Sequence, residues 1–335
     1  MHIPDNYLSP ATDAVLMVAM VPVWAHSAKR VSEDLNQKQI SFIGMAAAFS
    51  FLLMMFNVPL PGGTTGHAVG GTLIACLLGP HAACLAISVA LAIQALLFGD
   101  GGILAFGANC LNMAFVLPFV GHACYRLVAG NALSEGRRMA ALFVGSYVGL
   151  NVAALVAALE FGIQPLFFHD VAGQALYCPY PLSASIPAMC IPHLLVAGVV
   201  EGVATVAIYE FVARVAPDML VDAGTADDAG AKSSLVPVAV LIAALVVATP
   251  LGLLAEGTAW GEWGADEIAE TGAGFVPAGM VDGFEWESLM PDYTLGGLPD
   301  VVAYIASAVA GVAILVILFK LLASALRPRE GLSVS

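Results

Sequence analysis

Residues 68–98 read AVGGTLIACLLGPHAACLAISVALAIQALLF, an apolar stretch that is interrupted only at Gly79-Pro80. A membrane-spanning helix needs about 20 apolar residues to cross roughly 30 Å of hydrocarbon. The stretch therefore fits either one long helix or two shorter crossings that separate at the Gly-Pro pair, where a helix is expected to break. The choice between these two forms determines the topology of the rest of the chain.

The composition is that of a membrane protein. Of the 335 residues, 60% are hydrophobic and 11% are charged, and the mean hydropathy is +0.90. A soluble domain carries about 25% charged residues, and a disordered chain has low hydrophobicity. The six cysteines have no C-x-x-C spacing, which indicates neither a disulfide framework nor a zinc ribbon. We predict an all-α polytopic integral membrane protein of the cytoplasmic membrane.

The apolar segments along the chain are long enough, or nearly long enough, to span a membrane. They cover residues 9–28, 40–56, 82–98, 105–125, 139–160, 186–213, 235–254 and 301–323, with a shorter run at 68–78.

The basic residues decide between one helix and two in residues 68–98. With two crossings and an external N-terminus, all eleven Lys and Arg residues fall on the cytoplasmic side, as the positive-inside rule requires. A single helix would place Arg137 and Arg138 outside while Lys29 and Arg30 stay inside. We therefore predict nine transmembrane helices, with the N-terminus outside and the C-terminus inside.

A polar stretch divides the chain into two parts. Residues 1–213 form a block of seven predicted spans, and residues 214–234, rich in Asp, Ala and Gly, predict a flexible cytoplasmic linker. Residues 235–335 contain two spans around an external segment, 255–300, with ten acidic residues and no basic ones. This segment is either a solvated loop or a surface that gathers cations before they reach a site.

The first two residues form a preformed chelator. The amine of Met1, the deprotonated amide nitrogen of His2 and the His2 Nδ1 can bind one ion through fused five- and six-membered rings. Three nitrogens in a plane favour Ni(II) or Cu(II), whereas Zn(II) prefers a tetrahedron and Mg(II) or Ca(II) prefer oxygen. The first basic residue, Lys29, follows the first apolar run, which is not typical of a signal peptide, so we expect Met1 to be retained.

A fourth nitrogen is available at the end of a glycine-rich loop. Residues 57–67 read NVPLPGGTTGH, and the prolines and glycines predict an irregular external loop. The predicted topology places His67 on the same side of the membrane as Met1. We predict a metal site formed by Met1, His2 and His67. The loop residues expected to support it are Gly62, Gly63, Thr64, Thr65 and Gly66.

The remaining histidines and the acids within spans are open to two interpretations. The other histidines are interpreted as interfacial or hydrogen-bonded residues, although the last two of the five could assist the path of an ion: His26, His81, His122, His169 and His193. Glu160 and Glu201 lie within predicted spans, where an ionisable residue is costly and indicates a function by default. For Glu201, a structural hydrogen bond to a neighbouring helix is an equal alternative.

Three segments resemble one transporter family. MHIPDNYLSP (1–10), NVPLPGGTTGHAVGG (57–71) and TPLGLLAEGTAWGEW (249–263) are similar to the substrate-binding (S) component of energy-coupling factor transporters for nickel and cobalt, the NikM/CbiM type. The resemblance covers nearly the whole chain and implies ligation by Met1, His2 and His67, with the glycine-rich loop closing the site. The family commonly begins MHIPDGFLS; here Asn6 replaces the glycine, and Asn tolerates the left-handed conformation, so we expect a turn there.

Residues 235–335 are similar to the small two-span partner of these transporters, the NikN/CbiN type. The resemblance implies a seven-helix S-component core fused to a C-terminal helix pair. It also implies a complex with a transmembrane coupling protein and a pair of ATPase subunits, with no nucleic acid and no catalytic cofactor. The sequence contains no G-x-x-x-x-G-K-[ST], so we expect the chain not to be an enzyme and ATP hydrolysis to reside in the partners.

The function implied is the capture of Ni(II) or Co(II) for ATP-driven import, the latter for cobalamin synthesis. Nickel is favoured and cobalt follows closely. The alternative is a self-sufficient secondary permease for divalent metal. The small-residue pairs Gly44/Ala48 and Gly145/Gly149 have GxxxG-like spacing, which suits close helix contact either with a coupling protein or within this chain.

Overall fold

The computed structural model describes residues 1–130, 134–217, 220, 235–255, 257–265, 267–281 and 283–325. Helices account for most of the regular structure in this part of the chain, and its one sheet has two strands. The predicted helical membrane fold is confirmed. Most of the predicted linker 214–234 lies outside the described residues.

The described residues of the first part of the chain form ten α-helices. They are α1 (Pro10–Asp34), α2 (Gln37–Met54), α3 (Gly71–Leu78), α4 (Pro80–Ile93), α5 (Phe106–Asn109), α6 (Leu117–Ala129), α7 (Glu135–Gly162), α8 (Gln164–Phe167), α9 (Leu182–Pro192) and α10 (Gly198–Val215). Three π-helical segments continue or join them: η1 (Gln94–Phe98), η2 (Cys110–Val116) and η3 (His193–Ala197).

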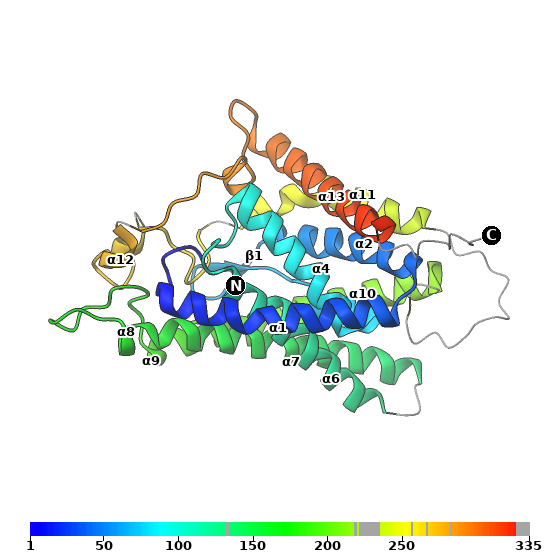
Figure 1. Cartoon of the computed structure of the whole chain (residues 1–335), viewed down its shortest axis with the longest axis horizontal. Coiled ribbons are helices and arrows are strands. Elements are labelled where there is room, and N and C mark those ends of the chain that lie inside the picture. The colour runs from blue at the N-terminus through cyan, green and yellow to red at the C-terminus, as the bar shows by residue number, and fades with distance from the viewer. Residues whose placement is uncertain are drawn as a thin grey trace, which may run out of the picture.

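The later part of the chain has fewer helices and a long connection between its two main ones. Its helices are α11 (Val236–Ala248), α12 (Ala278–Val281) and α13 (Asp300–Ala325), with 3₁₀ segments η5 (Thr249–Leu254), η6 (Ile268–Glu270) and η7 (Pro291–Tyr293). Figure 1 shows α13 lying along α2, with α12 at the far end of the molecule beside α8.

Polar side chains begin several of the long helices. The Ser9 hydroxyl accepts a hydrogen bond from Thr12 N at the start of α1, and Ser134 caps α7 in the same way. At the start of α2, Asn36 accepts from Gln39 N while the Gln39 side chain accepts from Asn36 N. Such caps satisfy amide groups that have no partner within the helix.

Among the described residues, seven helical stretches are long and apolar enough to cross a membrane, and α2 is a shorter apolar helix. The remaining predicted crossing, residues 68–78, contains only the eight-residue α3, which extends about 12 Å. The helix breaks at Gly79, with φ of 90°, directly before Pro80. The predicted break is therefore confirmed, and the crossing before it is a half-helix preceded by non-helical chain.

The glycine-rich segment differs from the irregular loop that the sequence predicted. It forms an antiparallel hairpin of β1 (Val58–Leu60) and β2 (Thr64–Gly66), with Val58 opposite Gly66. Gly62 and Gly63 both have positive φ in the connection. The hairpin forms because pairing two strands satisfies backbone groups that would otherwise be buried without a partner.

The two small-residue motifs pack helices of this chain against each other. A methyl group on Gly145 or Gly149 of α7 would lie 2.7 or 2.6 Å from a carbonyl oxygen of α6. A methyl group on Gly44 of α2 would lie 2.7 Å from the Phe319 Cβ of α13. These motifs could have served contact with a coupling protein or packing within the chain, and the structure shows packing within the chain.

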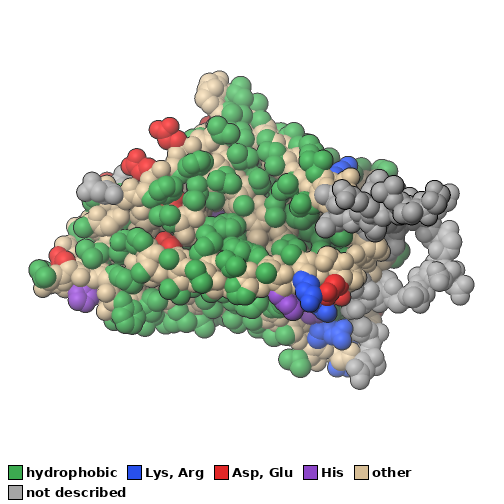
Figure 2. Space-filling model, viewed as in Figure 1, with side chains coloured by type: hydrophobic (Ala, Val, Ile, Leu, Met, Phe, Trp, Pro, Cys, Tyr) green, Lys and Arg blue, Asp and Glu red, His purple; other side chains and the backbone are tan. Residues whose placement is uncertain are grey.

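Basic and acidic side chains separate along the molecule. Lys29 and Arg30 lie in the C-terminal half of α1, before its last turn. Arg126 lies in the last turn of α6 and Arg214 in the last turn of α10. On the face drawn in Figure 2, the Lys and Arg side chains gather at one end, and most Asp and Glu side chains lie toward the other. This is the separation that the predicted topology requires.

Replacing Gly149 by alanine tests the α6–α7 packing. We expect Gly149→Ala to lower stability by about 1–3 kcal/mol, because the added methyl group overlaps the Leu117 carbonyl oxygen. Gly136→Ala in the same helix is the matched control, because no described residue lies within 4 Å of its added carbon. Thermal unfolding in detergent measures both variants, and equal midpoints would contradict this packing.

Candidate metal centre

The N-terminus is buried in the protein rather than exposed. Met1, His2 and Ile3 are 6%, 2% and 0% exposed. Ile3 N donates to the Asn109 side-chain oxygen over 2.7 Å, and the Ile3 carbonyl accepts from Asn109 Nδ2 and Gly102 N. These bonds replace the water that a free N-terminal strand would bind, and they fix the position of the two residues before Ile3.

The next residues turn the chain toward α1. The Asp5 carboxylate accepts from Ile103 N and Leu104 N over 3.1 and 2.7 Å. Asn6 has φ of 64°, so the predicted left-handed turn at this position is confirmed. Its amide also pairs with both backbone groups of Phe284, over 2.8 and 2.9 Å. Asn6 thus makes the turn and ties the N-terminus to the 255–300 segment.

His67 follows the hairpin and is held by contacts from other helices. The Glu201 carboxylate of α10 accepts from Val69 N over 2.7 Å and from Gly70 N over 3.0 Å. The Ser50 hydroxyl of α2 donates to the Val69 carbonyl. Glu201 therefore makes a structural hydrogen bond, one of the two alternatives for this residue, and it anchors the chain immediately after His67.

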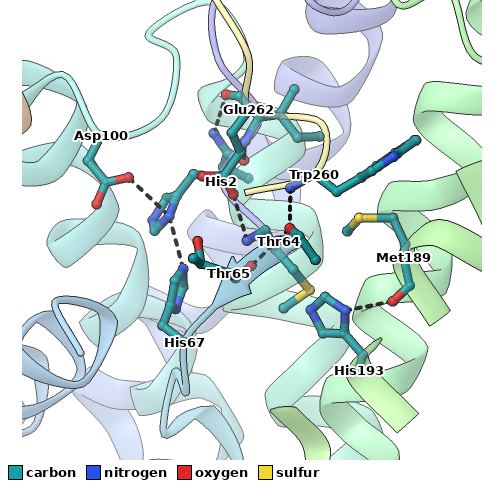
Figure 3. Close-up of polar contacts among 12 residues, drawn as sticks. His2, Thr64, Thr65, His67, Asp100, Met189, His193, Trp260 and Glu262 are labelled. Atoms are coloured by element: carbon teal, nitrogen blue, oxygen red, sulfur yellow. Dashed lines mark hydrogen bonds and ion pairs between the residues drawn. The ribbon is translucent and has the colours of Figure 1, made fainter. Parts of the chain in front are cut away.

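The imidazoles of His2 and His67 meet at the centre of the site (Figure 3). His2 Nδ1 and His67 Nε2 lie 3.2 Å apart. Metal–nitrogen bonds of about 2 Å at right angles place neighbouring ligand nitrogens about 2.8 Å apart. A small movement of either ring brings the two nitrogens to that spacing.

The backbone fixes the tautomer of His67. His67 Nδ1 lies 3.2 Å from the Ala68 carbonyl oxygen, which can only accept a hydrogen bond. The ring proton of His67 is therefore assigned to Nδ1, and the Nε2 lone pair faces His2. A backbone carbonyl that binds the second ring nitrogen is the usual support of a metal-binding histidine.

Two carboxylates hold the N-terminal dipeptide. The Met1 ammonium donates to Glu262 Oε1 over 2.9 Å, and His2 Nδ1 lies 3.1 Å from Asp100 Oδ1. Figure 3 shows Asp100 and Glu262 on different sides of this dipeptide. Within the described residues no three His, Cys, Asp or Glu side chains form a metal-binding group. A site at this position would therefore draw part of its ligands from the amine and the main chain.

Burial keeps both imidazoles neutral at neutral pH. Burial and the adjacent N-terminal ammonium lower the pKa of His2 to about 4. Burial lowers the pKa of His67 well below its usual range, and the ammonium adds to the effect. A neutral imidazole has a free lone pair, which is the form that binds a metal ion.

A cavity of ≈ 360 Å³ adjoins the site. His2, Thr65 and His67 line it from the first part of the chain, and Glu262 and Asp292 line it from the 255–300 segment. The acidic segment thus contributes to the walls around the predicted site.

The structure brings together Met1, His2 and His67. Of the loop residues expected to support them, some lie beside the cavity and others do not. Thr65 lines the cavity, and Thr64 Oγ1 accepts from Trp260 N over 2.7 Å. Nothing lies within 4 Å of an added carbon at Gly62 or Gly63, while one at Gly66 would press against Leu60.

Three polar residues near His2 were missed by the sequence analysis: Gln94, Asp100 and Tyr293. Gln94 lies within the last turns of the apolar run 82–98 and Asp100 follows it, and polar residues at these positions were the available signal. Glu262 was included only as one of the acids of segment 255–300. His193 lies beside the site, and its Nδ1 donates to the Met189 carbonyl over 2.7 Å (Figure 3).

The fold and these contacts together define a polytopic membrane protein that buries an amine and two imidazoles at its N-terminus, a candidate cation site. Residues 2–219 match the family described as cobalt uptake substrate-specific transmembrane region (CbiM), and residues 234–328 match the PDGLE domain. The chain belongs to the CbiM family.

Several relatives are similar over most of their length. The chain is 50% identical to the probable fused nickel transport protein LarMN of Lactiplantibacillus plantarum, over 96% of this chain and 97% of the relative. It is 47% identical to the fused nickel transport protein NikMN of Rhodobacter capsulatus, over 94% and 95%. A crystal structure of a truncated transition-metal transporter matches with a TM-score of 0.61 and 51% identity, over 64% of this chain and 99% of that one.

Titration of the histidines tests the burial of the site. In the metal-free protein we expect the His2 imidazole to gain its proton near pH 4, because charging it inside the protein is unfavourable. The folded state then binds this proton less tightly than the unfolded chain, so the contribution of His2 to stability falls as the pH drops from 6.5 to 4.

Nitrogen NMR of labelled histidines measures this midpoint, and a His2→Ala variant assigns the signal. A midpoint near pH 6.5 would show that His2 is solvated and that the site is not formed.

Proposed function

We propose that the chain captures Ni(II) or Co(II) outside the cytoplasmic membrane for ATP-driven import. The observation that carries the proposal is the 3.2 Å approach of His2 Nδ1 to His67 Nε2, with the Met1 amine in the same dipeptide. The amine, the His2 amide, His2 Nδ1 and His67 Nε2 supply four nitrogens. In a planar arrangement His67 Nε2 lies opposite the His2 amide nitrogen. It is then adjacent to His2 Nδ1, which agrees with the 3.2 Å between these two atoms.

The donor set favours nickel. Square-planar nitrogen coordination suits Ni(II), and the sulfur or carboxylate ligands of other metal sites are not needed. Two relatives with about half of their residues identical are named nickel transport proteins, while the matching family is described by cobalt uptake. Nickel is the proposed substrate, and cobalt is the close second.

The orientation follows from the charges. An external N-terminus places the metal site and the acidic segment 255–300 on the outside and the basic helix ends of the chain in the cytoplasm. The acidic segment then faces the side from which the cation arrives and raises its local concentration.

Energy for import would come from other proteins. The sequence has no Walker A motif, so we propose that the chain acts with a transmembrane coupling protein and a pair of ATPase subunits. A secondary permease would use ionisable side chains within the membrane. Glu201, the acid nearest to mid-span, is engaged by Val69 N and Gly70 N, which favours the ATP-dependent alternative.

Metal titration tests the ligands. The purified protein should bind Ni(II) when Met1 is its first residue. We expect binding to weaken by more than about 100-fold in two forms of the protein: one with a removable extension of several residues before Met1, and a His67→Ala variant. This loss exceeds the roughly 10- to 100-fold loss that is typical when a residue supporting a ligand is replaced. Cutting the extension with a protease that leaves Met1 at the start should restore affinity.

The matched control is His169→Ala, which removes an exposed imidazole and should bind like the native protein. Equal affinity of the extended and the cut protein would contradict the proposed chelate.

Uptake in cells tests the energy source. Cells that make the chain together with the coupling protein and the ATPase pair should accumulate Ni(II), because reorientation of the loaded chain requires ATP. Cells that make the chain with ATPase subunits lacking their Walker lysine should not. Equal accumulation by both strains would support a self-sufficient permease instead.

A further inference from the structure

We propose that side chains of the 255–300 segment position the ligands of the metal centre without binding the ion themselves. In this proposal Glu262 holds the Met1 amine, and Tyr293, acting through Gln94, sets the tautomer in which His2 presents Nδ1 to the ion. Both are positioning residues rather than ligands. The inference rests on the proposed function and adds to it a role for side chains of the fused segment.

Glu262 can bind the Met1 amine with or without metal. An amine that coordinates through its lone pair keeps two N–H groups, and Glu262 Oε1 lies 2.9 Å from this nitrogen. A divalent ion bound by one deprotonated amide and three neutral nitrogens carries a net charge of +1. The Glu262 carboxylate, 22% exposed beside the buried amine, offsets that charge.

Gln94 is held in one orientation by a residue of the fused segment. Its Nε2 donates to Tyr293 Oη over 3.0 Å and to Asp100 Oδ2 over 3.0 Å. Tyr293 in turn donates to Asp100 Oδ2 over 2.5 Å. Both amide hydrogens of Gln94 are used in this cluster, so its Oε1 points to the other side. There it is buried and has no hydrogen-bond partner in the part of the chain that the structure describes.

His2 Nε2 is another buried atom that has no hydrogen-bond partner among the described residues. His2 Nδ1 faces two acceptors, Asp100 Oδ1 and the lone pair of His67 Nε2, so in the metal-free protein the ring proton is assigned to Nδ1. Asp100 joins this imidazole to Gln94, because its Oδ1 lies 3.1 Å from His2 Nδ1 while its Oδ2 accepts from Gln94 Nε2 over 3.0 Å. Two acceptors, His2 Nε2 and Gln94 Oε1, are thus left unsatisfied in this tautomer.

Metal binding resolves this conflict. When Nδ1 binds an ion, the neutral ring keeps a single proton, which then resides on Nε2. Nε2–H can donate to Gln94 Oε1, so both orphan atoms gain a partner in the metal-bound tautomer. Donation of the second ring nitrogen to an oxygen is the usual way in which a protein orients a metal-binding histidine.

The backbone around Tyr293 is held in an uncommon conformation. Asp292 and Tyr293 are consecutive non-glycine residues with φ of 50° and 61°. The Tyr293 ring stacks on Phe98 with centroids 4.8 Å apart and meets the edge of Tyr304. A disfavoured backbone conformation that is fixed by its surroundings indicates a position selected for its side chain.

The test measures Ni(II) affinity and the visible absorption band of the bound ion for variants of the full chain. Glu262→Ala and Tyr293→Phe should each weaken binding by about 10- to 100-fold, and Glu262→Gln, which can still accept a hydrogen bond, should recover part of the loss. Tyr293→Phe should also shift the absorption band, because it releases the imidazole. In a Gln94→Leu background, Tyr293→Phe should have little further effect, since Tyr293 acts through Gln94.

Two matched controls separate positioning from general effects. Glu285→Gln removes one charge from an exposed site of the same segment. Tyr147→Phe removes a tyrosine hydroxyl that donates to the Leu194 carbonyl, outside the residues that line the cavity. Both controls should bind Ni(II) with the native affinity and spectrum.

The outcomes distinguish this inference from the proposed function. If the native protein does not bind Ni(II), the proposed function is wrong and the inference falls with it. If the native protein binds while Glu262→Ala, Glu262→Gln and Tyr293→Phe match the two controls, the inference is overturned and the proposed function stands. If Glu262→Ala fails to fold, the Ni(II) affinities of Glu262→Gln and Tyr293→Phe decide whether the inference stands.

Discussion

Asn109 binds Ile3 through both atoms of its amide, over 2.7 and 3.0 Å. Its side chain thereby supplies the two hydrogen bonds that a neighbouring strand would make, and Gly102 N adds a third. An extended N-terminal segment has no intrahelical hydrogen bonds to satisfy its backbone groups, and burying them unpaired would cost several kcal/mol. Without this pairing the segment would be hydrated and His2 would move away from His67.

The other half of the site meets the same constraint in a different way. The chain between α2 and α3 is not helical, and such backbone is tolerated near the membrane only where protein satisfies its polar groups. The β1–β2 hairpin pairs part of it internally, and Glu201 and Ser50 bind the groups around Val69. The N-terminus and the hairpin are thus two buried polar segments whose hydrogen bonds leave the His2 and His67 nitrogens facing each other.

Local rules predicted much of this arrangement. The Met1-His2 start, the spacing of His67 and the left-handed turn at Asn6 depend on chemistry that is visible within a few residues. The hairpin was missed because its weak strand pattern of prolines and glycines resembles a loop. The partners of Glu201 and the cluster around Gln94 and Tyr293 could not be predicted, because side-chain contacts between residues more than 100 positions apart leave no periodic signal.

X-ray absorption at the nickel K-edge of the loaded full chain tests the central claim most directly, because it reports ligand type and geometry without a variant. We expect four nitrogen ligands at about 2 Å in a planar arrangement, with the scattering pattern of two imidazole rings. A six-coordinate ion bound mainly by oxygen, or a site with a single imidazole, would contradict the joint ligation by His2 and His67.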